Sequence, residues 1–86
     1  MEKIMSAVEV RFFASLREET GTADWQVTVS SVAALLDAIK SQFGEAAWRA
    51  VTADNVRIAV NQTLIDCDAS LQPGDEVAFL PPVTGG

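Results

Sequence analysis

Apolar and polar residues alternate along residues 7–14, in the stretch AVEVRFFA. This period of two predicts a strand with one face turned toward a core. The apolar face carries Val8, Val10 and Phe12. Phe13 is the exception, because it places a large apolar side chain on the face that Glu9 and Arg11 occupy.

A second alternating stretch, ADWQVTV at residues 23–29, aligns Trp25, Val27 and Val29 on one face. REETG precedes it and predicts a turn at Gly21, since glycine adopts turn conformations without a steric penalty. Together the two stretches predict an N-terminal hairpin with a loop over residues 15–23.

The pattern changes to a helical period in SSVAALLDAIKSQFG, residues 30–44. Its apolar residues recur every three or four positions, which predicts a helix that begins at a Ser30 or Ser31 N-cap and ends at Gly44. The apolar stripe consists of Val32, Leu35, Leu36, Ile39 and Phe43. EAAWRAV, residues 45–51, is expected to add a short helical turn.

Two regions in the second half of the chain predict strands. NVRIAV at residues 55–60 alternates, and a turn at Asn61-Gln62 and a short apolar pair at residues 64–65 follow it. GDEVAFL then predicts a last strand over residues 76–80, because the glycine and aspartate favour a turn just before it.

Pro81-Pro82 must end this last strand because proline has no amide hydrogen to donate to a neighbouring strand. The expected order is strand, strand, helix, strand, a short strand or turn, strand. A helix across one sheet face buries both apolar surfaces, so we expect an α+β fold with a mixed sheet packed against one main helix. Residues 1–82 form the expected domain, and residues 83–86 a flexible Gly-Gly tail.

Composition narrows the possible functions. Twelve acidic and six basic residues among 86 give a net charge of −6 without any basic run, which disfavours nucleic-acid binding. The chain has no histidine or tyrosine and one cysteine, so triad catalysis, an intramolecular disulfide and ordinary zinc or other metal sites are not expected. With no apolar stretch long enough for a bilayer or a secretory signal, we expect a cytoplasmic protein without a membrane partner.

Acidic pairs beside predicted turns are interpreted as solvated turn residues rather than as acid/base groups. They are Glu18-Glu19, Asp66/Asp68 and Asp75-Glu76. The unusual chemical group is the carboxylate of Gly86, because neither Gly85 nor Gly86 has a Cβ that would prevent passage through a narrow slot. Such a carboxylate can be activated as an acyl adenylate and attacked by an amine or a sulfur donor. On the glycines alone, chance is an equal alternative.

Three stretches closely resemble the small, sulfur-carrier subunits of molybdopterin synthase, a family of ubiquitin-like β-grasp proteins. They are VRFFASLREETG, VNQTL and GDEVAFLPPVTGG, and the likeness runs from Val8 to Gly86. The resemblance implies that a ubiquitin-activating-like adenylyltransferase adenylates Gly86 with ATP. A sulfur donor enzyme would then convert it to a thiocarboxylate, a C-terminal 1-thioglycine.

The resemblance also implies the partner and the fate of the sulfur. The tail would enter the active site of the large synthase subunit, in a heterotetramer of two small and two large subunits. There the sulfur would pass to cyclic pyranopterin monophosphate and form the molybdopterin dithiolene. The large subunit would supply the catalytic groups, so this chain itself is expected to bind no cofactor.

Site residues follow from the same resemblance and from the strand faces, since Phe13 lies on the charged face of the first strand and Leu80 is expected to point outward with Ala78. Val83, Thr84 and Gly85 would thread the tunnel, and the partner-binding residues would be Phe13, Arg17, Leu80, Pro81 and Pro82. The family typically has phenylalanine where this chain has Leu80. The alternatives are that Phe13 packs under a loop and that Arg17 is a solvated turn charge.

Other functions use the same kind of tail. They are a sulfur carrier for thiamine synthesis or tRNA thiolation, a ubiquitin-like modifier that forms an amide with lysine, and a plain interaction domain. The context FLPPVTGG favours the molybdenum-cofactor carrier, because thiamine-type carriers usually end in a different local sequence.

Overall fold

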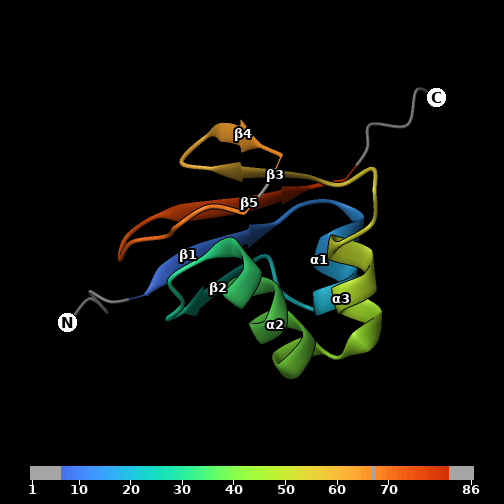
Figure 1. The fold of residues 1–86 in the computed structure, drawn as a ribbon. Helices are drawn as coiled ribbons and strands as arrows, with labels where there is room; N and C mark the ends of the chain where they lie inside the picture. Colours follow the sequence, from blue (N-terminus) through green and yellow to red (C-terminus); the bar gives the residue numbers. More distant parts are fainter. Residues whose placement is uncertain (1–6, 67, 82–86) are drawn as a thin grey trace.

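The computed structural model describes residues 7–66 and 68–81. This part of the chain contains five strands and three helices, joined by turns and short loops (Figure 1). The strands are β1 (Val8–Phe12), β2 (Asp24–Val27), β3 (Arg57–Val60), β4 (Thr63–Ile65) and β5 (Glu76–Leu80). The helices are α1 (Ser15–Thr20), α2 (Val32–Phe43) and α3 (Glu45–Val51).

The strands form one mixed sheet in the order β2-β1-β5-β3-β4. β1 runs antiparallel to β2 and parallel to β5, whereas β3 runs antiparallel to both β5 and β4. The parallel pair at the centre joins the first strand to the last. Its register places Val10 beside Val77 and Phe12 beside Phe79, so the apolar faces of both strands coincide. The predicted mixed sheet is confirmed.

The core lies between the sheet and α2, the longest helix. Val32, Leu35 and Ile39 from α2 are buried together with the apolar faces of β1 and β5, as the helical stripe predicts. The ring of Phe12 stacks on Phe79 with centroids 5.6 Å apart, and Phe43 meets Phe12 edge-on at 5.8 Å. Such contacts add to the apolar burial that holds the layers together.

The prediction of a loop over residues 15–23 was wrong in part, because α1 forms at Ser15–Thr20 and ends at Gly21 in a left-handed conformation with φ 79°. The helix buries Leu16, which is 3% exposed. One apolar residue in a six-residue polar segment carries no readable period, and so short a helix is stable only once it packs on the fold. The turn at Gly21 and the β1–β2 pairing are confirmed, with β2 shorter than predicted.

Three consecutive amides in the first turn of α2 donate hydrogen bonds to chain outside the helix. The acceptors are the Ser31 hydroxyl at 3.1 Å, the Asp68 carboxylate at 2.9 Å and the Ala69 carbonyl at 2.9 Å. The predicted N-cap at Ser31 is confirmed. Asp68 is exposed, as predicted, but it also fastens the segment after β4 to the start of α2.

The turn between β3 and β4 is the one that the sequence predicts. Asn61 and Gln62 have φ values of 50° and 72°, and two positive values in a two-residue hairpin loop indicate a type I′ turn. The Asn61 side chain also bonds to the start of β5. It accepts from the Glu76 amide at 3.0 Å and donates to the Asp75 carboxylate at 3.1 Å. The edge hairpin is thereby tied to the central strand.

Candidate functional site

One face of the sheet is left open, because the helices pack against the other (Figure 1). Strand pairing places Arg11 beside Ala78, Ala78 beside Ala59, and Ala59 beside Leu64. Since side chains directly opposite each other in a sheet point to the same side, these four residues form a row across the open face. The two alanines in the middle of the row have short side chains, so the centre of the row is recessed.

A hollow of about 590 Å³ lies on this open face. Its lining, called the open-face surface below, consists of Arg11, Phe13, Ala59, Gln62, Leu64, Glu76, Ala78 and Leu80. Phe13 is 43% exposed and Leu64 55% exposed, and no other large apolar residue in the described ranges is as exposed. Apolar side chains gathered on an exposed surface and bordered by polar ones are typical of a protein interaction site.

The structure places the predicted partner-binding residues in two groups. Phe13 and Leu80 both line the open-face surface, and Pro81, half-buried, directly follows Leu80. Arg17 lies on α1, exposed and away from this surface. Pro82 and the predicted tail residues 83–86, with Gly86, lie outside the described residues.

Phe13 is held at the point where β1 ends. Its amide donates to the Phe79 carbonyl at 3.4 Å, and its carbonyl accepts from the Leu16 amide at 3.0 Å. Ala14, the next residue, has a φ of 52°, a conformation that a residue with a Cβ adopts only at some cost in free energy. This tight turn starts α1 immediately after the strand, so the Phe13 ring stays on the sheet face instead of packing under a loop.

A cluster of ion pairs borders the apolar residues. The Arg11 guanidinium contacts the carboxylate of Glu76, that of Asp24 at 3.5 Å and that of Glu9 at 3.9 Å. Exposed pairs of this kind add little to stability. Because three carboxylates surround one cation, this border is negative overall, and it suits a partner with basic groups around an apolar anchor.

Sequence reasoning did not include Ala59, Leu64 or Arg11 in the site. Leu64 carried a usable signal, since it is a large apolar residue beside a predicted turn. Ala59 carried none, because it becomes part of the surface only through its pairing with Ala78 and Leu64.

Two further properties bear on function. None of the helices in residues 7–66 and 68–81 has the length and apolar character needed to span a bilayer. Within the same ranges no three side chains of the histidine, cysteine, aspartate and glutamate types gather in an arrangement that could hold a metal ion.

Comparison with known proteins gives a family and a fold. The ThiS family model matches residues 10–86. The molybdopterin synthase sulfur carrier subunit of Escherichia coli is 43% identical over 82 residues, which cover 92% of this chain and 99% of that protein.

Solved structures agree with the sequence match. The small archaeal modifier protein 1 of Methanosarcina acetivorans superposes with a TM-score of 0.79 at 26% identity, over 98% of this chain and 100% of that one. A chain in the complex of subunits 1 and 2 of the molybdopterin-converting factor from Helicobacter pylori gives 0.69 at 27% identity, over 93% and 99%. With its mixed five-stranded sheet, its helices on one face and these matches, the chain belongs to the ThiS family of ubiquitin-like β-grasp proteins.

Proposed function

We propose that this chain is the sulfur carrier subunit of a molybdopterin synthase and that its sulfur is held as a thiocarboxylate on Gly86. The observation that carries the proposal is the similarity to the Escherichia coli carrier subunit over nearly its whole length. The order of elements and the exposed apolar surface beside the end of β5 support it, because a carrier needs a stable domain and a docking surface but no catalytic groups of its own.

The proposed chemistry has two steps on the carrier. A partner adenylyltransferase joins the Gly86 carboxylate to the AMP part of ATP and releases pyrophosphate. Hydrosulfide supplied by a sulfur donor enzyme then attacks the acyl carbon and displaces AMP, which leaves a thiocarboxylate. Since ATP is the activating substrate, the proposal places the chain in the cytoplasm.

The second half of the proposal is delivery. The thiocarboxylate sulfur attacks cyclic pyranopterin monophosphate in the large subunit, and water then cleaves the bond between that sulfur and the Gly86 acyl carbon, which releases the carrier as a carboxylate. Two carriers supply the two sulfurs of the dithiolene in a heterotetramer with two large subunits. The Helicobacter pylori structure is described as a complex of subunits 1 and 2, which supports a large subunit as the partner. We assign docking to the open-face surface, and passage through the partner's tunnel to Val83, Thr84 and Gly85.

A second candidate is a ubiquitin-like modifier that forms an amide with a lysine of another protein. It is favoured by the similarity to small archaeal modifier protein 1. Both candidates begin with an adenylate on Gly86 and differ in the group that attacks it.

Intact-mass spectrometry distinguishes the candidates. The purified chain is incubated with the adenylyltransferase, ATP and a sulfur donor, and then with the large subunit and cyclic pyranopterin monophosphate. A carrier gains the mass of one sulfur-for-oxygen exchange and loses it again as dithiolene product forms. A modifier gives a stable adduct with a lysine-containing protein instead.

The matched control is a variant that lacks Gly86. It should keep the thermal unfolding midpoint of the intact chain and form neither the thiocarboxylate nor the adduct, since a terminal residue contributes little to stability. If the intact chain never gains sulfur under these conditions, the carrier proposal is wrong.

A further inference from the structure

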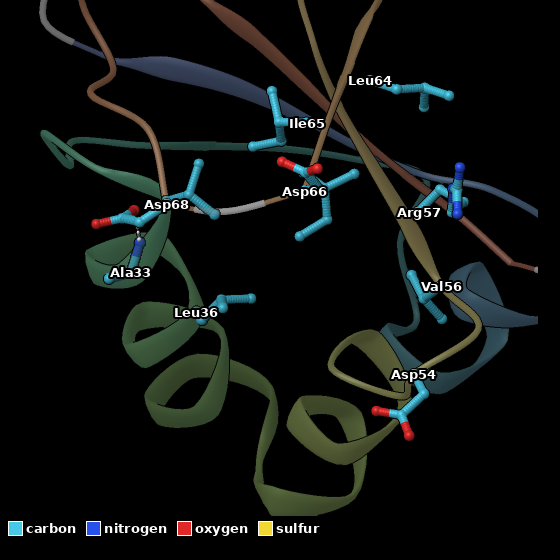
Figure 2. Close-up of a pocket in the computed structure, with 11 residues that line it drawn as sticks. Ala33, Leu36, Asp54, Val56, Arg57, Leu64, Ile65, Asp66 and Asp68 are labelled. Atoms are coloured by element: carbon cyan, nitrogen blue, oxygen red, sulfur yellow. Dashed lines mark hydrogen bonds between the residues drawn. The ribbon is translucent and has the colours of Figure 1, made fainter.

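The sheet is wider than the helical layer that covers it. β3 and β4 lie at the edge of the sheet away from β2 (Figure 1). A groove lies beneath them on the core face. The groove has a volume of about 620 Å³ and is bounded by the first turns of α2, by β3 and β4, and by the segment after β4 (Figure 2). Its apolar floor lies on the helix-covered side of the sheet, opposite the open-face surface, and the two surfaces share Leu64 on the edge strand β4.

The floor of the groove is apolar. Val32 belongs to the buried core, and Leu36, Val56, Ile58 and Ile65 pack against that core while remaining only partly buried. Residues at the same depth under β1 and β5 have no exposed surface, as Val10 and Val77 show. The groove therefore keeps apolar surface in water that a bound side chain would cover, at a gain of about 25 cal/mol for each Å².

The rim of the groove is acidic. Asp54, Asp66 and Asp68 are all exposed there, and Arg57 is the cation that the lining contributes. Figure 2 shows Asp66 and Asp68 on the segment after β4 and Asp54 at the start of the chain that leads into β3. Among the described residues none of the three carboxylates forms an ion pair. Asp68 accepts hydrogen bonds from the Ala33 and Ala69 amides through one oxygen, so Asp54 and Asp66 are the carboxylates most available to a partner.

We propose that this groove binds a segment of a partner protein in which apolar side chains are flanked by lysine or arginine. The apolar floor would take the apolar side chains, and the three carboxylates would face the cations. Charge complementarity selects this occupant over an acidic or uncharged segment, and the net charge of −6 would speed its approach. The groove and the open-face surface share Leu64 at the edge of the sheet but otherwise have different linings, and the inference does not depend on sulfur carriage.

The test uses three synthetic peptides and nuclear magnetic resonance of the full chain labelled with ¹⁵N. The first peptide is a twelve-residue amphipathic sequence of leucine and lysine, the second has glutamate in place of each lysine, and the third has serine in place of each leucine. We expect saturable amide shifts near Leu36, Ile58 and Ile65 with the first peptide and none with the other two. Saturable shifts confined to the open-face surface around Phe13 and Leu80, with none near Leu36, Ile58 and Ile65, would contradict the inference, as would the absence of saturable shifts at about 1 mM of the first peptide.

Two double variants separate the groove's charge from the charge of the whole chain. D54N/D66N neutralises two rim carboxylates and leaves Asp68 to cap α2. E18Q/E19Q changes the net charge equally on α1, where both glutamates are exposed. We expect D54N/D66N to weaken the first peptide about fivefold at low salt, and E18Q/E19Q to weaken it less than twofold. Equal losses in both variants would show attraction to the overall charge and overturn the proposed site.

Discussion

Substitution of Phe13 is the most direct test of the assignment of docking to the open-face surface. The residue is 43% exposed on the open-face surface. If a phenylalanine buries about 200 Å² in full, the part still exposed is about 85 Å². At about 25 cal/mol for each Å², covering it in a complex contributes about 2 kcal/mol. F13A should therefore weaken binding to the large subunit about 30-fold.

The same substitution also affects the free chain, because the remainder of the ring is already packed. By the same conversion F13A costs at most about 3 kcal/mol of unfolding free energy, so binding must be measured well below the unfolding midpoint. F13L keeps most of the apolar area and should recover most of the affinity. L36A shortens an apolar side chain on the opposite side of the sheet and should leave the affinity unchanged.

Isothermal titration of the large subunit with each variant measures these affinities, and circular dichroism at the same temperature verifies that each variant is folded. Because an apolar contact is lost, the change should persist at high salt. An F13A affinity within twofold of the unsubstituted chain would refute the assignment of docking to this surface. Equal weakening by F13A and L36A would point to a general loss of structure instead.

Three further predictions concern stability and are measured by urea unfolding. D68A should cost about 1 kcal/mol by removing a cap of α2, whereas D68N, which keeps a carbonyl acceptor, should cost less; equal losses would contradict the cap. Q62G should stabilise by about 1 kcal/mol, because glycine adopts the φ of 72° without strain, and a loss would contradict the turn type. A hydrogen bond from the backbone amide of Gln72 and, second, one from the Asn61 side chain hold the pKa of Asp75 below its ordinary value. The ionised Asp75 therefore stabilises the folded chain above its unfolded pKa of 3.8, and this stabilisation is lost as the pH falls through the lower folded pKa. D75N should thus be less stable than the parent at neutral pH, by a gap that closes in acid, and a gap independent of pH would refute this cause.

Elements with a clear period were predictable from the chain alone. The alternation in β1 and β5 and the stripe in α2 show which residues are apolar and how far apart they lie along the chain. That spacing is enough to predict a strand or a helix with one buried face. The turn at Asn61-Gln62 followed from residue type in the same way. Such features can be predicted from local chemistry without knowledge of distant contacts.

Part of the candidate site was also predictable. Phe13 and Leu80 were identified because each is an apolar residue on the face of a strand turned away from the core. Ala59 was not, because an alanine carries no signal until neighbouring strands pair with it. Leu64 was overlooked although its position beside a predicted turn carried a usable signal.

The tertiary structure decided which faces meet and which surfaces stay uncovered. The parallel pairing of β1 with β5 places the first strand beside the last and aligns Phe13 and Leu80 on one side, a result of strand order and not of any local pattern. α1 is stable because Leu16 is buried in the core that the other elements form. The groove under β3 and β4 exists because five strands are wider than the helices that cover them. Periodicity determines the direction in which each side chain points, whereas the free energy of packing distant segments determines what each side chain meets.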